Sequence, residues 1–112
     1  MSYAKGFLAE EIACAFLSAQ GCAIIKRNFC CQYGEIDIIA LKEGVLHFVE
    51  VKSRTCAEPL YAITPAKLGK IHQSIQVFLQ ENPMPYDFCI DALVIRGALG
   101  RHTLEWLENI GF

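Results

Sequence analysis

A chain of 112 residues, 54% hydrophobic and 20% charged, has the size and composition of one globular domain, so we expect residues 1–112 to form a single folded unit. Its net charge of −2 provides no general basic excess, which argues against a protein that binds nucleic acid tightly and without specificity. The longest apolar run is far below the roughly 18 residues of a membrane span, and the N-terminus lacks an export signal, so we expect a cytoplasmic protein without a membrane partner.

The first predicted element is a helix that stops near Gly21. On a helical wheel its apolar face consists of Ala9, Ala13, Phe16 and Leu17. Glu10 lies beside this face, whereas Glu11 points the opposite way, as a solvated charge should. Wheel position alone favours a Glu10 side chain that reaches from the edge of the core to solvent.

Three strands are expected next, over residues 22–30, 35–41 and 45–53. The second and third strands form a hairpin, because residues 42–44 have turn chemistry. If Leu41 pairs with Leu46, every apolar residue of the hairpin gains a cross-strand partner. One face then carries Ile39 opposite Phe48, and the other face carries the pairs Ile38 with Val49 and Ile36 with Val51.

The same register places Asp37 opposite Glu50, and Glu35 opposite Lys52. Two carboxylates about 5 Å apart repel by roughly 3 kcal/mol at an effective dielectric near 20, which a purely structural sheet would not select. A divalent cation between them would remove the repulsion, because Mg²⁺ takes carboxylate oxygen ligands. Lys52 projects from the same face as Glu50, where it could orient a water or stabilise negative charge. An ordinary salt bridge from Lys52 to Glu35 or Glu50 is the structural alternative, and spacing alone leaves the two interpretations about equal.

The rest of the chain predicts a scaffold. Thr64 and Pro65 begin a second helix, which the pair Asn82 and Pro83 ends. Two further strands are expected at residues 86–95 and 102–106. Basic residues in the middle of the chain could form a local face for a phosphate backbone, and solvated side chains are the alternative. The candidates for this nucleic-acid contact are Lys26, Arg27, Arg54 and Lys67.

Histidine and cysteine form no metal-binding motif in the sequence. The six cysteines include no Cys-x-x-Cys pair, which predicts reduced and mostly buried thiols. The histidines are widely spaced and lack a companion cysteine at ligand distance in the sequence, so we interpret His47, His72 and His102 as structural. There is also no phosphate loop and no nucleophile elbow.

Two segments carry a resemblance to a known family. Residues 34–40 read GEIDIIA, and residues 48–54 read FVEVKSR. Together they closely resemble the paired signature of the YraN-like family of small bacterial proteins, a branch of the PD-(D/E)xK nuclease superfamily that is similar to Holliday junction resolvases. The match continues through Glu10 on the first helix and covers nearly the whole chain up to about Asp91. One departure is Cys89, which stands where the family often has an arginine.

The resemblance implies a restriction endonuclease-like α/β fold of order αβββαββ, with a central mixed sheet flanked by helices. It implies metal-dependent hydrolysis of nucleic-acid phosphodiester bonds, with DNA favoured over RNA and branched or structured DNA as the substrate. Asp37 and Glu50 would bind Mg²⁺ or Mn²⁺, Lys52 would orient water or stabilise charge, and Glu10 would complete the site.

Two further hypotheses remain at the level of sequence. The acidic balance and Cys89 favour a non-catalytic nucleic-acid-binding or protein-interaction module on a nuclease scaffold. Because a small nuclease covers few base pairs, a homodimer is also a reasonable hypothesis. The apolar positions that we expect to be exposed and available for it are Trp106, Leu107, Ile110 and Phe112.

Overall fold

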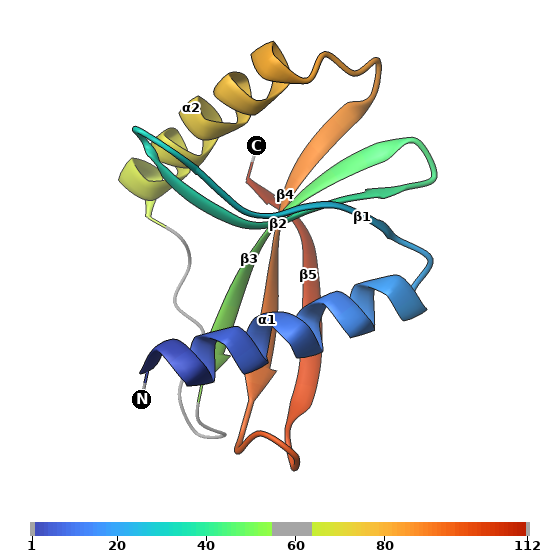
Figure 1. The fold of residues 1–112 in the computed structure, drawn as a ribbon, viewed down its shortest axis with the longest axis vertical. Coiled ribbons are helices and arrows are strands. Elements are labelled where there is room, and N and C mark those ends of the chain that lie inside the picture. The colour runs from blue at the N-terminus through green and yellow to red at the C-terminus, as the bar shows by residue number, and fades with distance from the viewer. Residues whose placement is uncertain (1, 55–63, 112) are drawn as a thin grey trace.

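The computed structural model describes residues 2–54 and 64–111, with side chains from Gly6 onward. The elements follow in the order α1 (Ser2–Ala19), β1 (Ala23–Cys31), β2 (Gly34–Lys42), β3 (Val45–Arg54), α2 (Pro65–Glu81), β4 (Asp87–Arg96) and β5 (Thr103–Gly111) (Figure 1). The predicted αβββαββ order is therefore confirmed. In these described ranges, no helix is long and apolar enough to cross a membrane.

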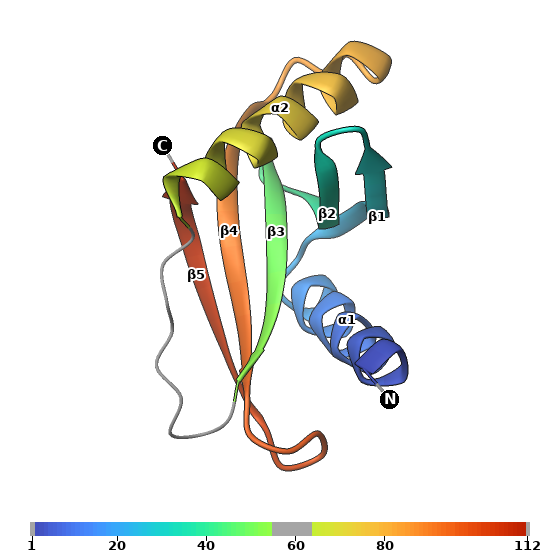
Figure 2. The same cartoon turned by 90° about the vertical axis from the view of Figure 1, so that its left-hand side faces the viewer.

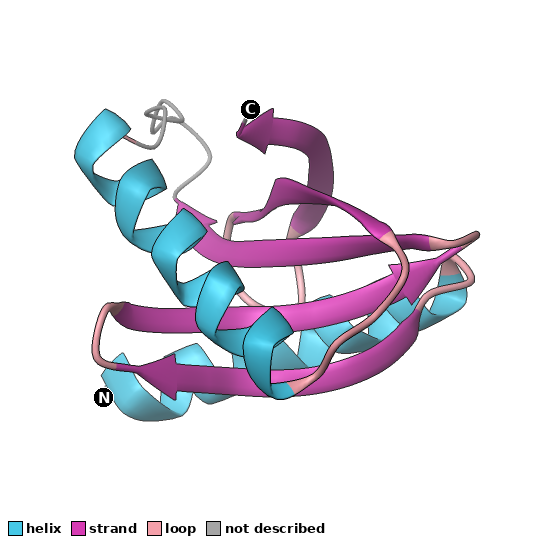
Figure 3. Ribbon diagram, turned by 90° about the horizontal axis from the view of Figure 1, so that it is seen from above, coloured by secondary structure: helices cyan, strands magenta, loops and turns pink. Residues whose placement is uncertain are grey.

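The strands form one mixed sheet in the order β1-β2-β3-β4-β5. Only the β3–β4 pair is parallel among the described strands, because α2 lies between these strands in the chain and returns it to the same end of the sheet. The two helices cover opposite faces of the sheet (Figure 3). This architecture is consistent with the restriction endonuclease-like fold that the resemblance implied.

Each face of the sheet has its own core. The α2 face contains a cluster that includes Phe29, Ile36, Ile39, Phe48 and Phe78. The α1 face contains a second cluster, with Ala13, Leu17, Ile38, Val49 and Leu93 among its members. The predicted apolar face of the first helix is confirmed, since Ala9, Ala13 and Leu17 are buried and Phe16 packs against the second cluster.

The predicted hairpin register is confirmed for the pairs Ile38 with Val49, Ile39 with Phe48 and Leu41 with Leu46. The prediction for Ile36 is wrong: its side chain belongs to the α2-face cluster and not to the α1 face that Ile38 occupies. The cause lies in β1, where Asn28 has a left-handed backbone with φ of 53° at the position across from Asp37. Both strands of the β1–β2 hairpin change faces there, and Figure 2 shows this hairpin between the two helices.

The helix caps agree with the sequence. The Thr64 side chain accepts a hydrogen bond from the Lys67 backbone N–H, Pro65 occupies the first turn of α2, and Asn82 ends the helix. The described cysteines are free thiols, as predicted, but the prediction that most are buried is wrong, since only Cys22 is buried and Cys30 is exposed. Partial burial is shared by the other three, Cys14, Cys31 and Cys89, and Cys56 lies outside the described residues.

The predicted dimer surface is not formed as expected. Trp106 and Ile110 are partly buried and pack against the two core clusters, because β5 runs on to Gly111 as a full edge strand of the sheet. Phe112 lies outside the described residues. Among the residues whose side chains the structure describes, the exposed large apolar ones are Phe7, Leu8, Ile25 and Tyr86.

Candidate functional site

The site begins with Asp37, which lies where the hairpin changes faces. The regular β2–β3 ladder ends at the pair Ile38 with Val49, so the expected pairing of Asp37 with Glu50 is not part of the described register. The Asp37 side chain instead bonds to the backbone of β3. The Asp37 carboxylate accepts a hydrogen bond from the Val51 N–H at 2.8 Å. This bond ties the Asp37 side chain to β3, the strand that carries Glu50 and Lys52.

Glu50 is a buried carboxylate, with 5% of the residue exposed. Its Oε1 atom lies 4.0 Å from Nζ of Lys67, which reaches over from the first turn of α2. Its Oε2 atom is buried and has no hydrogen-bond partner among the described residues. Because an unpaired buried acceptor normally costs about 1–3 kcal/mol, and more when it is charged, this atom calls for a ligand.

The two carboxylates make each other harder to ionise. Burial raises the pKa of Asp37 to about 6. The hydrogen bond from Val51 lowers this pKa, whereas the negative charges of Glu10 and Glu35 raise it further. Burial likewise raises the pKa of Glu50 to about 7, with Asp37 as the largest neighbouring charge. Both groups therefore exchange protons close to neutral pH, which is typical of functional sites.

Lys52 shares this environment. Burial lowers the pKa of the Lys52 ammonium, and the nearby Lys67 lowers it further, while Glu50 and Asp37 act in the opposite direction. Two lysines from β3 and α2 thus face two carboxylates from β2 and β3. Pairing of Glu35 with Lys52 is not part of the described β2–β3 register. Glu35 instead accepts a weak hydrogen bond from the Cys30 thiol at 3.6 Å.

Glu10 approaches the site from the opposite helix. Its side chain is half-buried on α1, and its charge contributes to the raised pKa of Asp37. Charges from α1, β2 and β3 therefore act together on Asp37, although Glu10 and Lys52 are 42 positions apart in the chain. Carboxylate oxygens, one of them buried without a partner, are the ligands that a hard divalent cation prefers, so Asp37 and Glu50 fit Mg²⁺ or Mn²⁺.

A cavity of about 430 Å³ adjoins this cluster between the β1–β2 turn and the start of α2. Asp37 and Glu50 do not line it, but two residues that do, Glu35 and Lys67, act on the charge of Glu50 and so link the cavity to the carboxylates. Lys70 lies on the same wall. The two lysines and the capped beginning of α2 give one side of this cavity a positive character that suits a phosphate group.

The four predicted phosphate contacts are not brought together. Lys67 reaches Glu50, and Arg54 ends β3, two residues beyond Lys52. Arg27 instead pairs with Glu11 of α1 at 3.1 Å, on the α1 face. Lys26 lines a cavity with Glu81 at the last turn of α2, and 14 helical residues place that turn about 20 Å from Lys67.

Sequence reasoning missed a second group of polar side chains. His47 was predicted to lack a companion cysteine, but the Cys89 Sγ atom lies 3.2 Å from its Nδ1 atom. The parallel β3–β4 register pairs these two residues directly, and no local pattern in the sequence predicts this pairing. Burial and Asp91 raise the pKa of the Cys89 thiol to about 12, so it is no nucleophile in this form.

The comparisons with known proteins agree on one family. Residues 9–95 match the profile described as "Uncharacterised protein family UPF0102". The UPF0102 protein of Wolinella succinogenes is 53% identical over 110 residues, which cover 98% of both chains. A UPF0102 protein of Helicobacter pylori strain J99 is 53% identical over 108 residues, covering 96% of this chain and 91% of the relative.

A third relative extends the similarity to another species. The UPF0102 protein of Helicobacter hepaticus is 46% identical over 106 residues, which cover 95% of this chain and 93% of the relative. These matches span both signature segments and α1. The chain belongs to the UPF0102 family, the YraN-like family of PD-(D/E)xK nuclease-like proteins.

Proposed function

We propose that this protein is a metal-dependent endonuclease that hydrolyses phosphodiester bonds in branched or structured DNA. One observation carries the proposal: the buried Oε2 atom of Glu50, without a partner among the described residues, beside Asp37 and Lys52. A structural sheet gains nothing from such a group, whereas a cation site requires it. The resemblance of residues 34–40 and 48–54 to the signature of PD-(D/E)xK nucleases supports the same chemistry.

Asp37 and Glu50 would hold Mg²⁺ or Mn²⁺. When bound, the ion supplies a Lewis acid for the phosphoryl oxygens and lowers the pKa of a coordinated water. Lys52 would hold the attacking water or stabilise charge on the phosphate, and Lys67 would offset the charge of Glu50. Glu10 would accept a hydrogen bond from that water. Hydrolysis forms one P–O bond to water and breaks the bond to the sugar oxygen, which takes up a proton.

The proposed substrate follows from the resemblance to junction-resolving nucleases and from the shape of the site. The cavity lined by Lys67 and Lys70 would receive a phosphate of the substrate, and Lys67 links it to Glu50. The net charge of −2 argues against general duplex binding and favours a substrate recognised by its geometry. The rival function is a binding module that has kept this scaffold without catalysis.

Cleavage of a labelled panel tests the proposal. The panel contains single-stranded, duplex, flap and four-way-junction DNA with matching RNA, each incubated with Mn²⁺ or Mg²⁺. We expect structured DNA to be cut by the wild type and left intact by Glu50→Gln and Lys52→Ala. The matched control is Glu11→Gln, which removes an exposed carboxylate from α1 and should cleave as the wild type does.

Two results would overturn the proposal. Products that persist in Glu50→Gln would come from a contaminating nuclease or another site. Intact substrate in every lane, together with bound DNA in a gel-shift measurement, would establish the non-catalytic module instead. RNA cleavage with intact DNA would keep the site and change the substrate class.

A further inference from the structure

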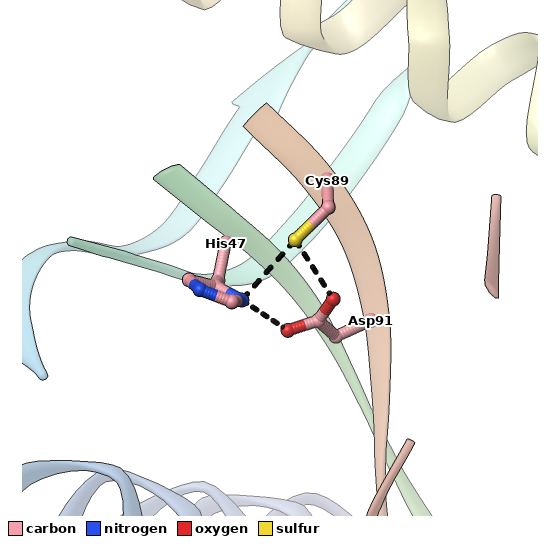
Figure 4. Close-up of side chains that lie close together, drawn as sticks. All are labelled: His47, Cys89 and Asp91. Carbon is pink, nitrogen blue, oxygen red and sulfur yellow. Dashed lines mark hydrogen bonds and ion pairs between the residues drawn. The ribbon is translucent and has the colours of Figure 1, made fainter. Parts of the chain in front are cut away.

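A second cluster of ligand-type side chains lies on the other face of the sheet from Glu50. Side chains along β3 point alternately to the two faces of the sheet, so His47, three residues before Glu50, points to the opposite face. The centroid of its ring lies 5.4 Å from the ring centroid of Trp106, which packs on the α1-face core. Cys89 and Asp91 come from the neighbouring strand β4. The three side chains point toward one another (Figure 4), and one ligand atom from each lies within 4.8 Å of the other two.

The distances within the cluster are those of hydrogen bonds. The Nδ1 atom of His47 lies 2.6 Å from Oδ2 of Asp91 and 3.2 Å from Sγ of Cys89. The Cys89 thiol donates to Oδ1 of Asp91, also at 3.2 Å. Because both partners meet the same ring nitrogen, His47 cannot relay a proton between them, so the group is not arranged as a catalytic triad.

These distances are close to those of a metal site. Ligand atoms around a tetrahedral zinc ion lie about 3.3–3.6 Å apart, given bonds of about 2.0–2.3 Å. The two contacts of Cys89 are already within a few tenths of an ångström of that spacing. The contact between His47 and Asp91 must open by about 0.7 Å for an ion to enter.

The support around Asp91 is already in place. Its Oδ1 atom accepts a hydrogen bond from the Asn109 N–H, and its Oδ2 atom accepts one from Nε1 of Trp106, both at 2.9 Å. Each carboxylate oxygen therefore has one bond to the scaffold and one to a ligand-type side chain. Carboxylates that bind metals are commonly held by such outer hydrogen bonds.

The backbone of β5 is shaped around this carboxylate. The β4–β5 register shifts between Ile90 and Ala92, so residues 108–110 stand opposite Asp91 alone. Asn109 adopts a left-handed conformation with φ of 56° in this bulge, which aims its N–H at Asp91. Bulges that re-aim a group in this way are frequent at functional sites.

We propose that His47, Cys89 and Asp91 form a second metal site, which binds a thiolate-preferring divalent cation such as Zn²⁺. The ion takes the place of the thiol proton of Cys89 and of any proton on Nδ1 of His47, and these protons pass to solvent. One thiolate and one carboxylate then balance the charge of the cation, and burial tolerates a neutral complex best.

The ligand types separate this site from the carboxylate cluster around Glu50. Soft sulfur and imidazole ligands favour Zn²⁺ or Co²⁺, whereas Mg²⁺ favours oxygen. A cavity of about 530 Å³ adjoins His47 and Cys89 and gives the ion access from solvent. The same cavity lets a water molecule reach the fourth position, which keeps the complex neutral.

Cobalt titration of the metal-free, reduced full chain tests the proposal, because Co²⁺ bound to a thiolate absorbs in the near ultraviolet. We expect a saturable band that Zn²⁺ abolishes by competition and excess Mg²⁺ leaves unchanged. Cys89→Ser should lose the band, and His47→Gln should weaken Co²⁺ binding at least tenfold. Trp106→Phe should lower the affinity about 10- to 100-fold, because an outer hydrogen bond to Asp91 is lost.

Two matched variants isolate the site. Cys30→Ser removes an exposed thiol elsewhere on the sheet and should keep the band, as should Glu50→Gln, which alters only the carboxylate cluster. Absence of a band in the wild type would overturn the proposal and leave a hydrogen-bonded cluster only. A band of wild-type strength in folded Cys89→Ser, checked by circular dichroism, would also overturn it, because another cysteine would then be the ligand.

Discussion

Glu50 and Asp37 are costly to the fold when both are ionised. Burial raises the pKa of Glu50 from 4.5 to about 7 and that of Asp37 from 3.8 to about 6, and each charge disfavours the other. In the unfolded chain both groups titrate near their ordinary values. Between about pH 4 and pH 7 the native protein therefore binds more protons than the unfolded chain, and its free energy of unfolding falls as the pH rises.

The variant Glu50→Gln should consequently be more stable than the wild type at pH 8, where the cost of the charged carboxylates is fully present. We expect a gain of roughly 1–3 kcal/mol, since one pKa unit corresponds to about 1.4 kcal/mol. The gain should shrink toward zero as the pH falls to about 4, below the pKa of a glutamate in the unfolded chain. Urea unfolding at several pH values measures it, and an equal loss of stability at pH 5 and pH 8 would contradict it.

Two comparisons sharpen this measurement. Glu11→Gln breaks an exposed ion pair with Arg27 and should change stability by less than about 1 kcal/mol, without a gain at high pH. Saturating Mn²⁺ should raise the Tm of the wild type at pH 8, because only the native protein offers the paired carboxylates. It should leave Glu50→Gln unchanged.

At the scale of the element, the β1–β2 hairpin decides where Asp37 points. Asn28 takes a left-handed backbone with φ of 53°, a conformation that asparagine tolerates and β-branched residues do not. The face change beside it releases Asp37 from the ladder, so that its carboxylate accepts the N–H of Val51. The irregular backbone at Asn28 thus determines the orientation of the Asp37 carboxylate in the site.

Substitutions at Asn28 should separate backbone strain from side-chain chemistry. Asn28→Gly should be close to neutral, because glycine adopts positive φ without a steric cost. Asn28→Val should lower the free energy of unfolding by about 1–2 kcal/mol and should also reduce the Mn²⁺-dependent rise in Tm, since Asp37 is displaced. Chemical denaturation with and without Mn²⁺ measures both, and a Val variant as stable as the Gly variant would contradict the role of the backbone.

The same hairpin shows what the sequence could predict. Alternating apolar residues predicted the pairs Ile38 with Val49 and Ile39 with Phe48, because a slip by one residue would bury charge. The face of Ile36 could not be predicted, since it depends on one backbone angle at Asn28. The convergence of Asp37, Glu50 and Lys52 was predicted from spacing and resemblance, and their roles stay a proposal.

Contacts between distant strands were beyond this reasoning. His47 and Cys89 are 42 residues apart in the chain, and their proximity requires the parallel β3–β4 register that α2 creates. Local periodicity carries no information on such a pairing. The same limit applies to Lys67, whose helical position predicted exposure but not its approach to Glu50 of β3.

At the scale of the whole molecule, the distribution of charge bounds how nucleic acid can bind. The net charge of −2 leaves no global attraction for phosphates, and Arg27 is paired with Glu11. The cations nearest the carboxylates are those at the cavity and at the end of β3, namely Lys52, Arg54, Lys67 and Lys70. Binding through this side would involve few phosphates, so affinity should be modest and weakly dependent on salt.

The salt dependence of DNA affinity can be measured by salt titration of DNA binding. With about three phosphates neutralised, the slope of log K against log salt should be about −3 for a four-way junction without divalent ions, as measured by fluorescence anisotropy. Lys70→Ala should reduce the magnitude of that slope by about 1, because its ammonium lines the cavity beside Glu35. Lys26→Ala is the matched control: it removes the same charge from β1, beside the last turn of α2, which 11 helical residues place about 17 Å from Lys70, and it should leave the slope unchanged. Equal losses in the two variants would mean that DNA does not approach along the cavity, and the site around Glu50 would then need another route to its phosphate.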